Sequence, residues 1–118
     1  MMRYLDSHEW IAADGKVGIT AYAQKELGHI VYIDLPKVGQ TVRAKEETCV
    51  LESTKAAVDI YSPVSGTVVS VNELLVKDPD LINRAPEEAG WLFQVALSDL
   101  HERDRLLTYS EYQKIISS

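Results

Sequence analysis

Short strand-like segments follow one another at even spacing through most of the chain, and this pattern constrains the fold more than any other feature of the sequence. Stretches rich in β-branched and aromatic residues alternate with turn-forming Gly, Pro, Asp and Asn. The predicted strands cover residues 16–20, 29–35, 38–42, 47–53, 58–61, 67–71 and 91–97. Spacing this short favours an all-β sandwich or barrel over a parallel sheet with helical crossovers.

Helices are expected only at the flanks of this β-structure. Residues 21–27 predict a short helix ended by Gly28, in the position usual after a helix C-terminus. Residues 72–88 are rich in Asp, Asn and Pro and predict a loop with one helical turn. A C-terminal helix is predicted over about 99–117, because Thr108-x-x-Glu111 is a capping box. The side chains expected to share one face of this helix and to pack on the sandwich are Tyr109, Tyr112, Ile115 and Ile116.

A weak internal repeat lies on the two sides of Lys55. Val38-Gly39-x-Thr41-Val42 and Val64-x-Gly66-Thr67-Val68 each place a glycine just before the β-branched start of a strand. Glycine turns before strands are common, so the repeat carries weight only together with its position. It suggests two similar halves that meet around a central hairpin.

Length and charge exclude several classes of function. A chain of 118 residues predicts one domain, residues 1–118, and its composition, 46% hydrophobic and 25% charged, is that of a globular protein. The formal net charge of −6 argues against binding to nucleic acid or to an anionic membrane. An acidic surface suits a protein that docks transiently on basic partners.

Cysteine content and targeting signals add two expectations. Cys49 is the only cysteine, so it is expected to pack as a small apolar side chain rather than to form a disulfide. No stretch has the apolar length of a membrane span, and domain-like sequence begins close to Met1. We therefore expect a cytoplasmic protein, or a mitochondrial one only if a transit peptide has been removed.

The segment around Lys55 predicts a hairpin tip that presents this lysine. A strand leads into it, another leads out, and small neighbours leave Lys55 uncovered, with Glu52 and Asp59 at positions −3 and +4. Taken alone, this spacing describes an ordinary solvated lysine. A lysine that nothing desolvates is a poor Schiff-base nucleophile or general base. Acylation of its amine by another enzyme stays open, because that enzyme supplies the activated acyl group.

A resemblance decides between these interpretations. Glu-Ser-Thr-Lys-Ala-Ala at 52–57, followed by Asp-Ile-Tyr-Ser-Pro-Val-Ser-Gly at 59–66, resembles the lipoylation segment of the glycine cleavage H-protein family. Further matching motifs occur in the family's order over more than a hundred residues. They are Ser7-His8-Glu9-Trp10, Val17 to Thr20, Leu27 to Pro36, Asn83, and Gly90-Trp91-Leu92-Phe93.

Related carriers fit less well. Biotinyl carriers typically place methionines on both sides of their lysine, whereas Lys55 lies between Thr54 and Ala56. Lipoyl domains of 2-oxoacid dehydrogenases usually have an Asp before the lysine and lack the His-Glu-Trp and Gly-Trp motifs. The resemblance thus implies a lipoyl-domain-like barrel-sandwich hybrid, with short flanking helices and a C-terminal helix.

The resemblance also implies a function without catalysis by the chain itself. Lipoate would be joined by an amide to Lys55, by a lipoate ligase or a lipoyl/octanoyl transferase, and the formal net charge would become −7. The arm would carry the aminomethyl group of glycine between the glycine decarboxylase P protein, the aminomethyltransferase T protein and the dihydrolipoamide dehydrogenase L protein. The residues expected to mark the modification site are Glu52, Asp59 and Gly66.

A cationic aminomethyl adduct hydrolyses readily, so a cleft lined by acids and hydroxyls would protect it. We expect Ser7, Glu9 and Asp59 to form such a lining, although Glu9 and Asp59 could equally be ordinary surface acids. Three positions depart from the family. Tyr22 and Glu26 stand where histidines occur, and His29 stands where an acid is usual, which bears on arm docking and partner choice.

Two alternatives remain open. The chain could act as a lipoyl or octanoyl donor or relay that serves other lipoyl domains, because that function needs the same hairpin. It could also be a β-sandwich interaction module with an unmodified Lys55. The three histidines lack metal-ligand spacing, so no metal site is predicted.

Overall fold

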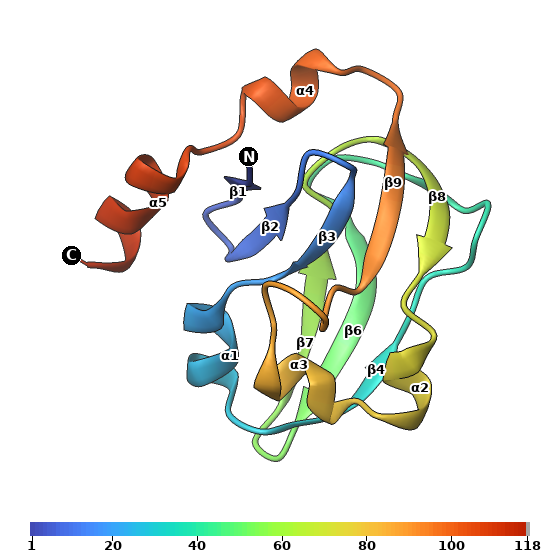
Figure 1. Ribbon diagram of the computed structural model, residues 1–118, viewed down its shortest axis with the longest axis vertical. Helices are drawn as coiled ribbons and strands as arrows, with labels where there is room; N and C mark the ends of the chain where they lie inside the picture. Colours follow the sequence, from blue (N-terminus) through green and yellow to red (C-terminus); the bar gives the residue numbers. More distant parts are fainter. Residues whose placement is uncertain (118) are drawn as a thin grey trace.

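Two antiparallel sheets form the body of the molecule in the computed structural model, which describes residues 1–117 (Figure 1). The larger sheet has the strand order β1-β2-β3-β9-β8-β5 and the smaller one the order β4-β6-β7. The strands of the larger sheet are β1 (Arg3–Tyr4), β2 (Glu9–Ile11), β3 (Lys16–Ile19), β9 (Phe93–Leu97), β8 (Gly66–Val71) and β5 (Thr41–Val42). Those of the smaller sheet are β4 (Ile30–Asp34), β6 (Glu47–Ser53) and β7 (Ala57–Tyr61). The predicted all-β sandwich is confirmed.

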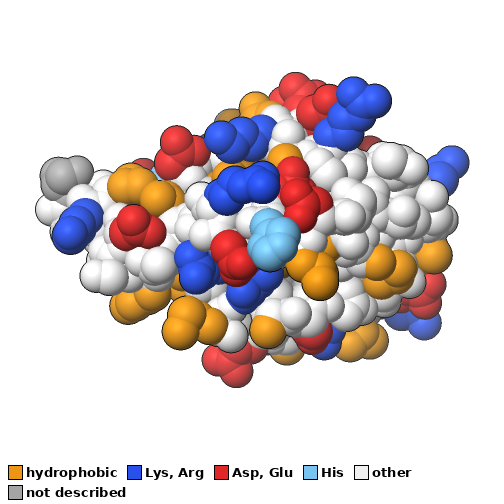
Figure 2. Space-filling view, turned by 90° about the horizontal axis from the view of Figure 1, so that it is seen from above, with side chains coloured by type: hydrophobic (Ala, Val, Ile, Leu, Met, Phe, Trp, Pro, Cys, Tyr) orange, Lys and Arg blue, Asp and Glu red, His pale blue; other side chains and the backbone are white. Residues whose placement is uncertain are grey.

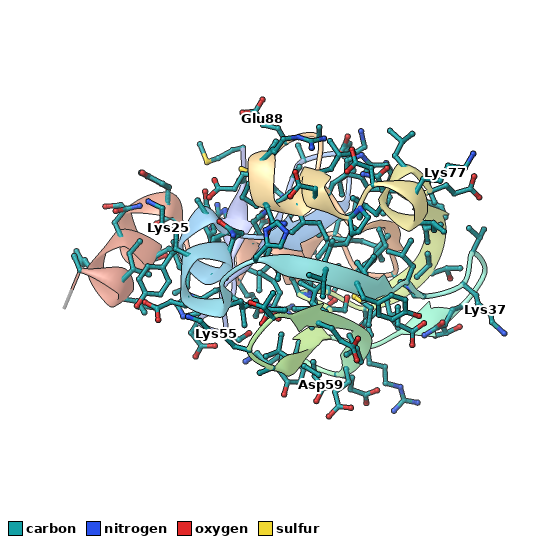
Figure 3. The ribbon with its side chains drawn as sticks, turned by 90° about the horizontal axis from the view of Figure 1, so that it is seen from below. Lys25, Lys37, Lys55, Asp59, Lys77 and Glu88 are labelled. Atoms are coloured by element: carbon teal, nitrogen blue, oxygen red, sulfur yellow. The ribbon has the colours of Figure 1, made fainter. Side chains whose placement is uncertain are left out.

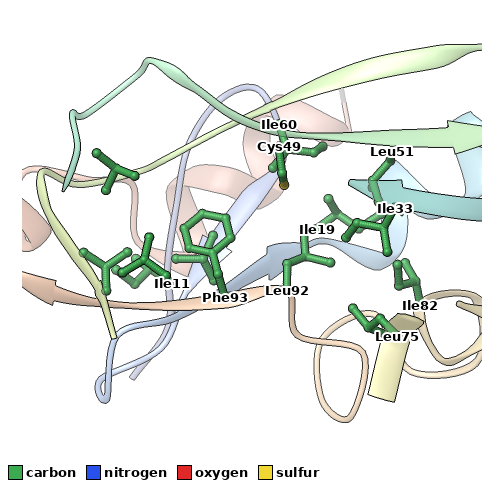
Figure 4. Packing of buried hydrophobic residues seen from close by; sticks show 14 of the residues in the cluster. Ile11, Ile19, Ile33, Cys49, Leu51, Ile60, Leu75, Ile82, Leu92 and Phe93 are labelled. Atoms are coloured by element: carbon green, nitrogen blue, oxygen red, sulfur yellow. The ribbon is translucent and has the colours of Figure 1, made fainter. Parts of the chain in front are cut away.

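The core lies between the two sheets (Figure 4). Cys49 and Leu51 of β6 point inward, because side chains alternate across a strand, and they meet Ile19 and Phe93 from the larger sheet. Phe93 and Leu51 have no exposed surface, and burying a side chain of this size contributes about 1.5–3 kcal/mol. Cys49 is 5% exposed and packs as an apolar residue, which confirms its expected role.

The two segments of the internal repeat lie side by side in the larger sheet. Thr41 pairs with Thr67 and Val42 with Gly66 across β5 and β8. The backbone N–H of Gly39 donates to the carbonyl of Val68 at 2.7 Å, just beyond these pairs. The repeat therefore joins the halves of the chain that precede and follow the β6–β7 hairpin.

Short helices cover one end of the sandwich, at the bottom of Figure 1. Helix α1 (Ala21–Leu27) has the predicted bounds and is capped by the Thr20 hydroxyl, with Gly28 after its last turn. The segment 72–88, predicted as a loop with one helical turn, contains two helices, α2 (Leu74–Lys77) and α3 (Asp80–Arg84). Leu75 and Ile82, one from each helix, are buried in the core.

The segment predicted as one helix over 99–117 is divided into α4 (His101–Asp104) and α5 (Tyr109–Ile116). The division has a clear cause, because Tyr4 and Leu107 exchange two backbone hydrogen bonds of 2.9 Å that hold Leu107 extended. The capping box of Thr108 and Glu111 then starts α5. Of the predicted packing face, Tyr112 is buried and Ile116 half-buried, whereas Tyr109 and Ile115 are exposed.

The surface at the α4 end of the molecule carries acidic and basic side chains intermixed (Figure 2). This face shows no continuous basic area of the kind that phosphate backbones require. Among residues 1–117, none of the helices has the length and apolarity needed to cross a membrane.

Candidate functional site

Lys55 lies at the tip of the β6–β7 hairpin, as the sequence predicted. Ser53 closes the turn, because its N–H donates to the Ala56 carbonyl at 2.8 Å. The Ser53 hydroxyl oxygen accepts hydrogen bonds from the N–H groups of Lys55 and Ala56, each at 3.1 Å. These bonds fix the backbone of the tip, while the side chain of Lys55 is exposed and forms no ion pair among residues 1–117.

The connection between α1 and β4 supports this tip from one side. The N–H of Thr54 donates to the His29 carbonyl at 3.0 Å. Gly28, with φ of +85°, lies beneath the lysine: a Cβ on Gly28 would be 3.4 Å from Lys55 Cε and 3.7 Å from Nζ. The aliphatic part of Lys55 therefore rests on a surface with no side chain of its own. Figure 3 shows Lys55 beside α1, with Asp59 farther along the hairpin.

Asn83 of α3 holds the α1–β4 connection in place. Its Oδ1 accepts from the Ile30 N–H at 2.8 Å, and its Nδ2 donates to the Ile30 carbonyl at 2.9 Å. Gln24 of α1 adds bonds of 3.2 Å from its Nε2 to the Gly28 carbonyl and to Asn83 Oδ1. Gln24 of α1 and Asn83 of α3 thus fix the backbone of the α1–β4 connection. The His29 carbonyl of this connection accepts the hydrogen bond from Thr54 at the hairpin tip.

Glu52 and Asp59 lie on the outward face of the smaller sheet. Val50 is opposite Asp59 on β7 and opposite Asp34 on β4, and Glu52 is two positions along β6. Side chains two apart on a strand share a face, so Asp34, Glu52 and Asp59 point to the same side. The strands β4, β6 and β7 contain no Lys or Arg, so this face, adjoining Lys55, is acidic.

Ser7 and Glu9 lie close together near Tyr61, at the end of β7 farther from Lys55. The Ser7 hydroxyl donates to Glu9 Oε1, and the Tyr61 N–H donates to Glu9 Oε2 at 2.9 Å. Glu9 is only 1% exposed, and burial raises the pKa of its carboxyl above the ordinary value, although the bonds from Ser7 and Tyr61 act against this rise. No cation pairs with this carboxylate among the described residues.

A small cavity adjoins Ser7 and Tyr61, the two residues bonded to this carboxylate, and Glu9 itself does not line it. It has a volume of about 200 Å³ and is lined by Leu5, Asp6, Ser7, Lys45 and Tyr61. Asp59, the third predicted cleft residue, lies two positions before Tyr61 on β7 and is exposed. Four residue steps of about 3.3 Å separate Tyr61 from Ala57, which adjoins the hairpin tip. The cavity therefore lies at the Tyr61 end of β7 and the hairpin tip at the Ala57 end, with Asp59 between them.

Gly66, predicted to mark the modification site, has a packing role in β8. A Cβ at this position would lie 2.1 Å from the Ala96 carbonyl oxygen and 2.8 Å from Val95 Cγ1. Only glycine allows β8 and β9 to approach so closely.

Comparison with known proteins agrees with this geometry. Residues 2–118 match the family model described as "Glycine cleavage H-protein". The glycine cleavage system H protein of Alcanivorax borkumensis is 52% identical, over 99% of this chain and 94% of that protein. Its counterpart in Thermotoga maritima is 47% identical, over 97% and 94%. The crystal structure of an H protein from Mycobacterium marinum superposes with a TM-score of 0.89 at 41% identity, covering 99% of this chain and 97% of that one.

The chain belongs to the glycine cleavage H-protein family. The three residues expected to depart from the family pattern lie in α1 or just after it. The Tyr22 ring is 4.9 Å from the ring of His8, and Glu26 is exposed on the helix. The side chain of His29 lies 3.8 Å from Asp80, and its carbonyl still holds Thr54.

Sequence reasoning did not identify the supports of the hairpin tip. Gly28 was interpreted only as a helix stop, Gln24 received no role, and Asn83 was only a matching motif. Their roles depend on contacts between segments distant in the chain, such as that of Asn83 with Ile30. The one local signal is Gly28, a glycine that ends a helix and comes just before the predicted strand 29–35.

Proposed function

We propose that this chain is a lipoyl carrier of the glycine cleavage system, with Lys55 as the attachment point and no catalytic role of its own. Membership of the H-protein family supports the system, and the presentation of Lys55 supports the residue. The observation that carries the proposal is an exposed lysine, in no ion pair with any of residues 1–117, on a turn whose backbone hydrogen bonds are satisfied without its side chain.

The residues around Lys55 fit an amide-linked lipoyl group. The side chain of Lys55 is exposed, its chain neighbours are the small Thr54 and Ala56, and the surface beneath it is Gly28. When bound, the lipoyl group would supply the dithiolane that carries the aminomethyl group of glycine between the P, T and L proteins. The fixed backbone of the tip supplies orientation, and the acidic face with Glu52 and Asp59 supplies a surface for the lipoate ligase or transferase.

Ser7, Glu9 and Asp59 are proposed to protect the cargo. Glu9 is a buried carboxylate with no cationic partner among the described residues, and it is bonded to Ser7 and Tyr61, which line the cavity together with Asp6 and Lys45. A positive amine in the cavity would meet the Asp6 carboxylate and the Ser7 hydroxyl, and Glu9 would act through its bond to Ser7. Ser7 holds this carboxylate by a hydrogen bond, and Asp59 lies between the cavity and the hairpin tip along β7. The chain's residues would then hold the amine and exclude water, and would move no proton.

The relay alternative, in which the chain donates lipoyl or octanoyl groups to other lipoyl domains, is less well supported. The matched relatives carry the glycine cleavage name over nearly their whole length.

The test is intact mass and peptide mapping of the protein produced in cells that contain a lipoylation pathway. We expect a lipoyl or octanoyl adduct confined to Lys55, lost in Lys55→Arg and retained in Lys37→Arg, a matched control at another exposed lysine. An unmodified Lys55 in the presence of active ligase and lipoate would contradict the proposal and favour an interaction module.

A further inference from the structure

His8 adopts an unusual backbone conformation beside the cavity at Ser7. Its φ is +77°, in the left-handed region that few residues other than glycine occupy. It closes the loop between β1 and β2, where its N–H donates to the Leu5 carbonyl at 3.1 Å and the Leu5 N–H donates to the Glu9 carbonyl at 2.9 Å. The conformation of His8 therefore sets the directions of Ser7 and Glu9, its two neighbours in the chain.

Contacts from two other parts of the chain hold His8 in this conformation. Its Nδ1 is 2.8 Å from the hydroxyl of Tyr112 on α5, and its carbonyl accepts from the Thr20 N–H at 3.0 Å. The same Tyr112 hydroxyl lies 2.7 Å from the Thr20 hydroxyl. A single hydroxyl of the C-terminal helix thus links the loop that carries Ser7 to the residue that caps α1.

Tyr112 is itself firmly placed. It is 2% exposed, and its ring stacks on Tyr4 at a centroid distance of 4.7 Å and an interplanar angle of 7°. Because the ring is anchored by stacking and the hydroxyl by hydrogen bonds, the two contributions can be separated by replacing tyrosine with phenylalanine.

We propose that Tyr112 is a positioning residue for the cargo cavity: through its hydroxyl it fixes His8, and through His8 it fixes Ser7 and Glu9. This inference rests on the proposed function, since it assigns α5 a part in holding the cargo of the arm. Without the hydroxyl, His8 loses its side-chain partner and keeps only the backbone bonds to Leu5 and Thr20, so its left-handed conformation is less stable and the β1–β2 loop moves away from β7. The hydrogen bond from the Tyr61 N–H to Glu9 then opens more often.

The experiment compares Tyr112→Phe with Tyr109→Phe, a control that removes an exposed tyrosine hydroxyl from the same helix. Hydrogen exchange of the Tyr61 amide, followed by NMR on the protein without lipoate, reports the Glu9 contact directly. We expect about tenfold faster exchange in Tyr112→Phe and no change in Tyr109→Phe. Amides of the buried β6 strand serve as an internal reference and should exchange at the wild-type rate in both variants.

A second readout concerns the cargo. Both variants should accept lipoate on Lys55 as the wild type does, whereas the aminomethyl-loaded form of Tyr112→Phe should decay several-fold faster. His8→Asn should reproduce this phenotype, because asparagine tolerates the left-handed conformation but lacks the imidazole contact. Adding Tyr112→Phe to His8→Asn should then have little further effect, since both substitutions remove the same contact.

Unchanged Tyr61 exchange in both Tyr112→Phe and His8→Asn would overturn the inference, as would an additive double variant. Failure of the proposed function would look different. Lys55 would then accept no lipoate in any variant, while the Tyr61 exchange, measured without lipoate, would still decide whether Tyr112 positions the cavity.

Discussion

Glu9 shows how much a single buried acid depends on its surroundings. Burial is the largest influence on its carboxyl and raises its pKa above 4.5, and the bonds from Ser7 and Tyr61 only partly offset this. The folded protein therefore binds this proton more tightly than the unfolded chain does. The resulting stabilisation is fully present below the unfolded pKa and is lost as the pH rises through the folded pKa.

Glu9→Gln should remove this dependence on pH. An amide keeps the shape and can still accept the Tyr61 N–H, but it does not ionise. As the pH rises above about 4.5, we expect the free energy of unfolding of the wild type to fall relative to that of Glu9→Gln. Urea unfolding at a series of pH values measures it, with Asp59→Asn as the exposed control. A difference that stays constant with pH would show that Glu9 does not titrate as inferred.

Gly66 permits a second test at the scale of one residue. The predicted role in modification and the packing role have different consequences, because a Cβ at this position meets the Ala96 carbonyl. We expect Gly66→Ala to lower the free energy of unfolding by about 1–3 kcal/mol, as overpacking does. Thr67→Ala, at the next and exposed position of β8, should have a much smaller effect. Full stability with lost lipoylation in Gly66→Ala would favour recognition over packing.

Lys55 could be predicted from the sequence, whereas the environment of Glu9 could not. The lysine lies in a local pattern of strand, small residues and strand, and its exposure follows from that pattern. The burial of Glu9 depends on Tyr61, which is 52 positions away in the chain. Pairing of this kind is set by the packing of the two sheets and leaves no local signal in Ser-His-Glu-Trp.

The elements show a similar division. The bounds of β6 and α1 matched the prediction because apolar alternation, helix capping and a terminal glycine are local signals. Strands β1 and β2 were missed because β1 is only two residues long and β2 three. The C-terminal helix was predicted as one element because the bridge between Tyr4 and Leu107 joins opposite ends of the chain.

The hairpin tip depends on elements outside it, and this can be tested through Asn83. Replacing Asn83 with alanine leaves both the N–H and the carbonyl of Ile30 without their partners, which costs about 1–3 kcal/mol. The freed α1–β4 connection holds Thr54 less firmly, so Lys55 is presented less uniformly to the modifying enzyme. We expect the KM for enzymatic lipoylation to rise about tenfold, with a smaller change in kcat.

The control for Asn83→Ala is Arg84→Ala, the next residue in α3. Arg84 pairs with Asp78 and Asp80 on the surface and makes no bond to Ile30. Its replacement should leave lipoylation kinetics close to those of the wild type. Equal kinetics for both variants, at a temperature where both are folded, would mean that α3 does not support the hairpin tip.

The charge of the whole molecule is distributed unevenly around the modification site. The formal net charge is −6, and the strands of the smaller sheet contribute Asp34, Glu47, Glu52 and Asp59 without a single Lys or Arg. An enzyme that modifies Lys55 must approach this sheet, so its docking surface is expected to be basic. Attraction between exposed charges is screened over about 10 Å at 0.1 M salt.

Salt should therefore weaken docking without slowing the chemical step. We expect the KM for lipoylation of Lys55 to rise several-fold between about 50 mM and about 300 mM NaCl, while kcat stays nearly constant. Glu52→Gln should reduce this salt dependence, because it removes a charge from the face beside the hairpin. Glu88→Gln removes one on the opposite side of the molecule (Figure 3), has the same effect on net charge, and should leave the dependence intact. If both variants behaved alike, net charge alone would account for docking, and the acidic face of the smaller sheet would have no special part in it.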